Sequence, residues 1–306
     1  MSRLNFAALS AVAVIPLALA ACTTATEPAG ANAPVAPGAA TTTAAKSDAA
    51  AALVPQELRT KGEIVFAHDA SYPPFEYFDK DNTTIIGFDA QLADAIAAKL
   101  GLKAKHVNTG FDTILAGLTS KKHDVGMSAF TVTPERTKTV DFVVYFSGGT
   151  AIAVPKGNPQ NLAMDPLKLC GHKISAQKGS IQGLEQMPAI DKTCRQAGKP
   201  GLTIQLYPSQ NDANLALASG RVDAIAADSV SLAYQGKLAG GSFELAPGAD
   251  YEPAPGGIAL AKGSSLTAAV GEAVKELAAD GTLTKLGASW SLPAQVFTPE
   301  DGTVVK

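Results

Sequence analysis

The alternation of apolar strand patterns with helical patterns constrains this 306-residue chain more than any other feature. Short apolar runs such as GEIVFAHD (62–69) and DVGMSAF (124–130) have the length of buried strands. Between them lie helical patterns, as in 87–101, where apolar side chains recur at every fourth residue. Strands alternating with helices predict an α/β fold built around a mostly parallel sheet.

The same alternation continues through the second half of the chain. The expected strands are 62–69, 103–107, 124–130, 150–157, 172–179, 202–209, 222–228 and 256–263, and the expected helices are 87–101, 111–122, 180–198, 211–220, 230–238 and 265–290. With this length and this number of elements, the chain is long enough for two domains.

Two segments in different halves of the chain are similar to each other. ILAGLTSKKHDVGMSAF (114–130) and NLALASGRVDAIAADS (214–229) each contain a leucine–alanine helix, a basic turn, an aspartate and an apolar strand. Asp124 precedes Ala129 by the same step as Asp223 precedes Asp228. Each segment ends at the carboxyl end of a strand, where open α/β sheets bind ligands. We therefore expect two similar lobes that direct both strand ends into one cleft.

The stretch FTVTPERTK (130–138) raises an electrostatic question. Thr133 followed by Pro134 is typical of a helix start and would place Arg136 in the first turn, where the helix dipole disfavours a cation. One interpretation is a solvated arginine paired with an acid such as Glu135. The other is an anion-binding site that a ligand completes.

The N-terminal residues predict export rather than a folded domain. Arg3 precedes the apolar run FAALSAVAVIPLALAAC (6–22), which is short for a membrane span and typical of a secretory signal peptide, residues 1–21. The small residues before Cys22 resemble the lipobox of bacterial lipoproteins, which implies cleavage before Cys22 and lipid attached to it. The alternative is an ordinary signal peptide with an incidental cysteine. Residues 22–53 are rich in alanine, proline and threonine, and we expect a flexible tether.

Composition excludes several other classes of site. The chain is 46% hydrophobic and 17% charged with a net charge of −3, and no basic stretch indicates nucleic-acid binding. Its four histidines lie far apart without ligand spacing, so we expect no metal and no cofactor. If Cys22 carries lipid, Cys170 and Cys194 remain, and in an exported protein they most simply form a disulfide.

Several motifs, taken together and in order, resemble a known family. HDASYPPFEYFD, IIGFDAQLADAIAAKLG, FDTILAGLTSKKHDV, TVTPERTKTVDF, SAQKGSIQG, LASGRVDAIAADS and GGIALAKGSSL cover nearly all of residues 57–292. They are similar to the bacterial extracellular solute-binding proteins, family 3, which deliver polar amino acids to ABC importers. The resemblance implies the type II periplasmic-binding-protein fold, with lobe 1 at 54–149 and 257–306, lobe 2 at 150–256, and two crossover strands between them.

The resemblance also implies the protein's role and partners. We expect a lipid-anchored monomer facing the periplasm or the cell exterior that captures an amino acid by lobe closure. Its partners would be the permease subunits of an ABC transporter. A glutamine-like or glutamate-like ligand is expected, although the residues leave its identity open.

Arg136 occupies the family position that holds the ligand α-carboxylate. A planar guanidinium can grip a carboxylate through two hydrogen bonds. Thr131 is expected to add a hydroxyl and an amide to the same group. Ser180 and Ile181, which follow Gly179 at a predicted helix start, are expected to add backbone amides.

The ligand ammonium is expected to meet groups from both halves of the chain. The resemblance assigns Asp228 to it, with backbone carbonyls or a hydroxyl from Ser128 and Ala129. Many relatives have glycine at the position of Ala129. An ordinary strand-end turn is the alternative interpretation of Asp228.

The ligand side chain is expected to lie between aromatic walls. Tyr72 and Phe111 are the candidates for these walls, although either could be ordinary core. Asp69 and Gln177 are expected to contact the tip of the side chain. Phe130 lies among the motif residues and is expected to pack in the core.

An enzyme is not the expected function. GMSAF (126–130) lacks the final glycine of a Gly-x-Ser-x-Gly elbow, and no phosphate loop or zinc helix is present. The serious enzyme alternative is a cyclohexadienyl dehydratase-like protein on the same fold, for which only Asp69 or Asp228 could act as acid or base. A ligand sensor for a signalling partner is a third possibility.

Overall fold

The computed structural model describes residues 44–306. The expected signal peptide, Cys22 and the tether up to residue 43 lie outside these residues. No helix within 44–306 has both the length and the apolar character that crossing a membrane requires.

A ten-stranded sheet has the order β5-β1-β6-β12-β7-β10-β8-β9, and β11 and β13 pair with β7. Its strands are β1 (Glu63–His68), β5 (Lys103–Asn108), β6 (Val125–Thr131), β7 (Val140–Pro155), β8 (Lys173–Gln177), β9 (Thr203–Tyr207), β10 (Ala224–Asp228), β11 (Phe243–Leu245), β12 (Tyr251–Ala261) and β13 (Val304–Val305). β1 is parallel to β5 and β6, and β8 is parallel to β9 and β10. β7 and β12 are antiparallel to each other and to the parallel groups that they join. The sheet is therefore mixed rather than mostly parallel as predicted, because these two strands run against their neighbours.

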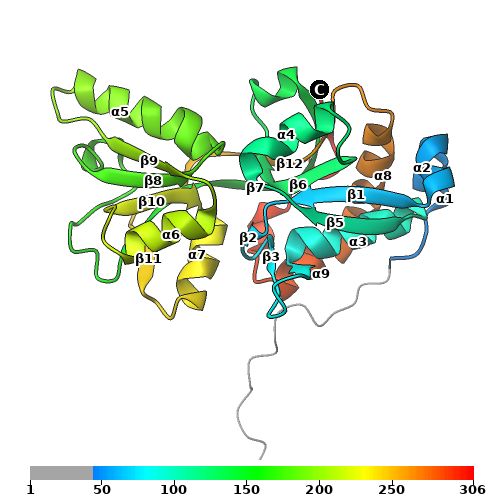
Figure 1. Ribbon diagram of the computed structural model, residues 1–306, viewed down its shortest axis with the longest axis horizontal. Helices are drawn as coiled ribbons and strands as arrows, with labels where there is room; N and C mark the ends of the chain where they lie inside the picture. The colour runs from blue at the N-terminus through cyan, green and yellow to red at the C-terminus, as the bar shows by residue number, and fades with distance from the viewer. Residues whose placement is uncertain (1–43) are drawn as a thin grey trace, which may run out of the picture. The chain divides into compact units, whose positions relative to one another are not determined.

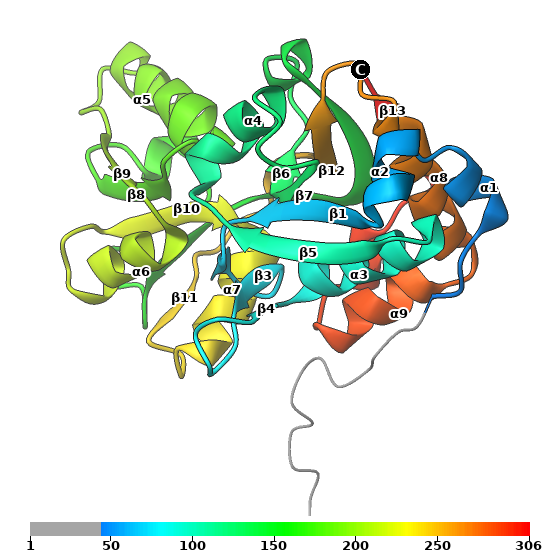
Figure 2. The same cartoon turned by 45° about the vertical axis from the view of Figure 1, so that its right-hand side comes forward.

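β7 and β12 connect two groups of elements (Figures 1 and 2). The first lobe contains β1, β5, β6 and β13, and the second contains β8–β11. β7 pairs with β13 near Val143 and with β10 near Ala153, so this one strand belongs to both lobes. The lobe boundaries predicted at 149/150 and 256/257 fall inside β7 and β12.

The helices of the first lobe cover its part of the sheet. They are α1 (Asp48–Ala52), α2 (Gln56–Lys61), α3 (Phe88–Leu100), α4 (Phe111–Thr119), α8 (Leu266–Ala279) and α9 (Thr282–Ser289). The predicted apolar stripe of α3 is buried from Phe88 to Leu100, and Gly101 ends the helix at φ 69°. The single helix predicted at 265–290 is instead two helices, because Gly281 takes φ 77° between them.

Residues 44–53 correct the predicted extent of the tether. Ser47 caps α1 by accepting the Ala50 N–H at 3.1 Å, and its own N–H donates to the Lys99 carbonyl at 2.9 Å. The Ser47 hydroxyl also donates to Glu276. Ala50 is fully buried. Small side chains therefore pack this segment closely onto α3 and α8, although it carries almost no large apolar residue.

The second lobe contains α5 (Met187–Gln196), α6 (Gln210–Ala218) and α7 (Ser229–Leu238). The helix predicted at 180–198 begins as a π-helical turn, Gln182–Gln186, before α5. The sequence also missed a three-stranded sheet in the first lobe, β2 (Ser71–Tyr72), β3 (Glu76–Phe78) and β4 (Ile85–Ile86). Its strands are only two or three residues long, too short for an alternating pattern to be recognised.

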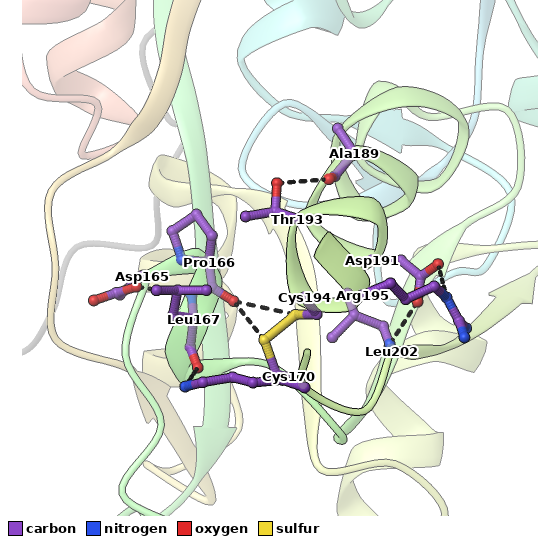
Figure 3. Close-up of a disulfide and its surroundings, with 11 residues drawn as sticks. Asp165, Pro166, Leu167, Cys170, Ala189, Asp191, Thr193, Cys194, Arg195 and Leu202 are labelled. Carbon is purple, nitrogen blue, oxygen red and sulfur yellow. Dashed lines mark hydrogen bonds and ion pairs between the residues drawn. A yellow bond between two sulfur atoms is a disulfide. The ribbon is translucent and has the colours of Figure 1, made fainter. Parts of the chain in front are cut away.

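The expected disulfide joins Cys170 to Cys194 (Figure 3). It ties the chain after the short 3₁₀ turn Pro166–Lys168 to the last turn of α5, with a Cα–Cα distance of 5.5 Å. The Pro166 carbonyl oxygen lies 3.5 and 3.6 Å from the two sulfurs. These are contacts rather than hydrogen bonds, because disulfide sulfurs carry no hydrogen.

Replacing both cysteines with serine should destabilise the folded protein by about 3–4 kcal/mol, because closing a loop with a sequence separation of 24 restricts the unfolded chain. Denaturant unfolding of the wild type and of Cys170→Ser/Cys194→Ser measures this difference. Intact mass with and without reductant checks the bond in the purified protein. Two free thiols in protein taken from its native compartment would contradict the pairing.

Candidate functional site

One cavity collects ten of the eleven residues that the sequence predicted for ligand binding. The empty space among its lining residues is about 330 Å³ when its opening to solvent is counted. The predicted residues on its wall are Tyr72, Phe111, Ser128, Ala129, Thr131, Arg136, Gln177, Ser180, Ile181 and Asp228. Residues of both lobes line the cavity, at the carboxyl ends of β6, β8 and β10.

Arg136 brings to this cavity a cation that no acid among residues 44–306 pairs with directly. Its guanidinium donates to the carbonyls of Thr131 at 2.7 Å and Gly179 at 3.0 Å. The guanidinium carbon also lies 5.8 Å and 5.4 Å from the ring centroids of Phe111 and Phe130. Within residues 44–306 it forms no ion pair.

Burial lowers the pKa of Arg136 to about 10, and more distant acids, Glu185 and Asp228, act in the opposite direction. The guanidinium therefore stays charged at neutral pH. A charged, desolvated guanidinium with no counter-ion favours binding of a small anion.

The local structure around Arg136 differs from the prediction. Thr133 does accept the Arg136 N–H, at 3.2 Å, but the expected helix is a single 3₁₀ turn, Arg136–Lys138. A turn this short has no appreciable macrodipole, so the predicted conflict with a helix dipole does not exist. The surface-pair interpretation is also wrong, because Glu135 pairs with Lys138 instead.

Asp228 brings a carboxyl group to the cavity from the second lobe. Its Oδ2 accepts the Tyr72 hydroxyl at 2.7 Å, and its Oδ1 accepts the Gln182 side-chain amide at 3.2 Å. Burial raises the pKa of Asp228 to about 6, while Tyr72, Gln182 and Arg136 act to lower it. At neutral pH this carboxylate can accept hydrogen bonds from a cationic group.

Asp69 departs from its predicted role. Its Oδ2 accepts the Phe111 N–H at 2.9 Å and the Gln177 side-chain amide at 2.8 Å, and its Oδ1 accepts the Ser71 hydroxyl at 2.7 Å. It is absent from the cavity wall. The carboxyl group therefore links the lobes and caps α4, rather than facing the tip of a ligand side chain.

Two buried carboxyl groups, those of Glu76 and Asp89, accept hydrogen bonds from Ser128 and Ala129. The Ser128 hydroxyl donates to Glu76 at 2.6 Å and accepts the Asp69 N–H at 3.1 Å, so its proton is committed and one lone pair remains for an ammonium. Ala129 has φ 47°, and its N–H donates to Asp89 at 3.2 Å. This left-handed conformation, which glycine adopts more easily, turns the chain near the end of β6.

Other predicted donors are also partly engaged. The Ser180 N–H donates to the Gln177 carbonyl at 3.2 Å, and its hydroxyl donates to the same carbonyl at 2.7 Å. No such bond engages the Ile181 N–H or the Thr131 hydroxyl within 44–306, so these two donors remain for a ligand. Phe130 is 1% exposed and stacks on Phe111 with centroids 4.6 Å apart, as expected of a core residue.

Sequence reasoning missed three residues on the cavity wall, Gln182, Gln210 and Ala227. The internal similarity contained the signal for one of them. Asp124 and Asp223 are 99 positions apart, and the same step leads from Phe111 to Gln210. Both residues begin a helix, α4 and α6, so the second copy of the motif marks Gln210 as the counterpart of an aromatic wall.

The fold and the site together define a two-lobed solute-binding protein of the type II periplasmic-binding class. Residues 64–293 match the family model of the bacterial extracellular solute-binding proteins, family 3, and the chain belongs to this family. Its location is therefore extracytoplasmic.

Two named relatives are similar over most of their length. The arginine-binding protein ArgT of Corynebacterium glutamicum is 30% identical over 79% of this chain and 78% of the relative. The L-cystine-binding protein TcyJ of Escherichia coli K12 is 30% identical over 76% and 84%.

Solved structures agree with the fold. An ancestral arginine-binding protein bound to arginine has a TM-score of 0.66 and 34% identity, covering 75% of this chain and 98% of that one. The ancestral amino acid-binding protein AncCDT-1, a precursor of cyclohexadienyl dehydratase, has a TM-score of 0.67 and 32% identity, covering 76% and 97%.

The pKa of Asp228 leads to a prediction for any ligand with an ammonium group. Below pH 6 the carboxyl group is protonated in the free protein, so a proton competes with the ligand. The dissociation constant should be flat above pH 7 and rise by about tenfold per pH unit well below 6. Calorimetric titration between pH 5 and 8 measures this. Asp228→Asn should bind more weakly but lose most of the acid dependence, and an unchanged dependence would assign it to another group.

Proposed function

We propose that the protein captures a free amino acid between its lobes and delivers it to the permease subunits of an ABC importer. Lobe 1 would comprise 54–149 and 257–306, extended by the packed segment 44–53, and lobe 2 would comprise 150–256. The protein would act as a monomer, carry no cofactor and perform no chemistry on its ligand.

The observation that carries this proposal is the pair of opposite charges on one cavity wall. Arg136, without a counter-ion, suits an α-carboxylate, and the Ile181 amide and Thr131 hydroxyl could complete that site. Asp228 comes from the other lobe and suits an α-ammonium. A free α-amino acid carries both groups on one carbon, so it would bridge the two lobes and stabilise closure.

The relatives support an amino acid as the ligand, and their names bear on the identity of its side chain. The names of ArgT and TcyJ specify arginine and cystine, whereas the residues of this chain led us to expect glutamine or glutamate. An ancestral arginine-binding protein has also been solved with glutamine bound, at 34% identity to this chain. Selection among these side chains depends on the cavity residues that the ligand side chain contacts.

A dehydratase is the second candidate, and one observation favours it. Asp228 has a pKa near 6 inside the cavity, which is suitable for an acid or base at neutral pH. However, Tyr72 and Gln182 already occupy both of its oxygens. Incubation with arogenate or prephenate decides the matter, because formation of a phenyl product would establish an enzyme. Amino-acid uptake by a deletion strain separates transport from sensing.

Arg136→Ala should weaken amino-acid binding by roughly 30-fold to several thousand-fold, because it leaves a buried carboxylate without its partner. Arg136→Lys keeps the charge but loses the paired hydrogen bonds, so a smaller loss is expected. Calorimetric titration gives the affinities, and melting curves without ligand show whether each variant is folded. Wild-type affinity in folded Arg136→Ala would refute the carboxylate assignment.

Lipid anchoring through Cys22 gives a separate prediction. Cys22→Ser should prevent lipid attachment and release the protein from membranes, because no other segment is expected to hold it there. Fractionation of cells followed by a high-salt wash measures the distribution. A variant that stays with the membranes would contradict the anchor.

A further inference from the structure

Gln210 lines the cavity and carries an unused hydrogen-bond acceptor. The residue is 1% exposed, begins α6 and lines the cavity wall. Its Oε1 atom is buried and has no hydrogen-bond partner among residues 44–306. A buried amide oxygen without a partner costs free energy, so a ligand that donates to it would gain the missing bond.

A chain of hydrogen bonds fixes which end of this amide is free. It begins at the Pro73 carbonyl, which can only accept, and which receives the Ser231 hydroxyl proton at 2.7 Å. Ser231 Oγ then accepts from the Gln235 amide nitrogen at 2.7 Å, and Gln235 Oε1 accepts from Asn214 Nδ2. Asn214 Oδ1 accepts from Gln210 Nε2 at 3.0 Å. Because every step is directional, the nitrogen of Gln210 is committed and its oxygen is left over.

One hydrogen-bonded neighbour of Gln210 adds negative potential. Its backbone N–H donates to Ser71 Oγ at 3.3 Å, and the Ser71 hydroxyl donates to Asp69 at 2.7 Å. The Asp69 carboxyl group is therefore two hydrogen bonds away. A ligand carboxylate near Gln210 would meet an amide oxygen and, close behind it, an acid.

We propose that Gln210 is a specificity-determining residue that selects amino acids whose side chains carry N–H donors. This inference rests on the proposed function and deepens it. Guanidinium, ammonium and carboxamide side chains can donate to Oε1, whereas the carboxylate of glutamate can only accept. Under this assignment the ligand class is arginine-, lysine- or glutamine-like rather than glutamate-like.

The glutamine/glutamate pair provides the sharpest test, because the two ligands are nearly isosteric. Calorimetric or competition titrations give the dissociation constants of wild type for arginine, glutamine and glutamate. Wild type should prefer arginine or glutamine to glutamate. In Gln210→Leu, arginine should bind roughly 10- to 150-fold more weakly and glutamine roughly 2- to 12-fold more weakly, while glutamate loses nothing. Gln196→Leu, an exposed position on α5 of the same lobe, is the matched control and should bind like wild type.

Ser231→Ala tests the direction of the chain without touching the cavity wall. It removes the step that orients Gln235, so the three amides can reverse and Gln210 can present its nitrogen. The preference for glutamine over glutamate should then shrink, even if weaker lobe closure reduces both affinities. If melting curves show that Gln210→Leu does not fold, the ratio of the glutamine and glutamate affinities in Ser231→Ala decides the assignment alone.

Three results would overturn the assignment. They are a wild type that prefers glutamate, an equal loss of all three ligands in Gln210→Leu, and an unchanged glutamine/glutamate ratio in Ser231→Ala. Failure of wild type to bind any of the twenty amino acids would be a different outcome, because it removes the proposed function itself.

Discussion

The charge of Arg136 is the feature on which the rest of the site depends. A guanidinium that has lost much of its water needs other partners, and residues 44–306 supply carbonyl oxygens and aromatic rings but no acid within ion-pair distance. One of those carbonyls, from Gly179, belongs to the second lobe. Gly179 has φ 85°, and an added Cβ would lie 2.9 Å from Cβ of Asp112. Close approach of the two lobes therefore requires glycine at this position, and that approach desolvates the cation.

A hydrogen-bond network connects the opposite charge, Asp228, to the strands between the lobes. Gln182 donates both to Asp228 and, at 2.9 Å, to Thr150 on β7. Thr150 donates to Gln186 at 2.6 Å, and Gln186 donates to Glu252 on β12 at 3.2 Å. A cation arriving at Asp228 would compete for the Gln182 bond and so act on a network that ends on both crossover strands. This is a physical route by which occupancy of the cavity could bias lobe closure.

Sequence patterns predicted most of the elements, whereas the family resemblance supplied most of the cavity wall. Strand ends and helix starts carry the motif residues, and the fold brings these ends together. The patterns failed where a residue's partner comes from a distant segment. Asp69 and Gln177 were both expected to face a ligand, yet they bond to each other across the lobes at 2.8 Å. Similarly, nothing near Ser128 in sequence indicates that its hydroxyl donates a hydrogen bond to Glu76.

The internal repeat explains why Asp69 and Gln177 meet. The aspartates Asp124 and Asp223 each accept the N–H of an adjacent parallel strand, from Val65 and Lys173. Asp69 lies four residues after Val65, and Gln177 lies four residues after Lys173. The pair that joins the lobes therefore occupies equivalent places in the two copies.

The same equivalence relates Ala129 to Asp228 and Phe111 to Gln210, 99 positions apart in each case. Two similar scaffolds thus present different chemistry at matching points. At these points the first lobe places Ala129 and Phe111 on the cavity wall, whereas the second places Asp228 and Gln210 there. Under the proposed function, a ligand with a carboxylate at one end, an ammonium beside it and a donor at its tip would therefore need both lobes at once.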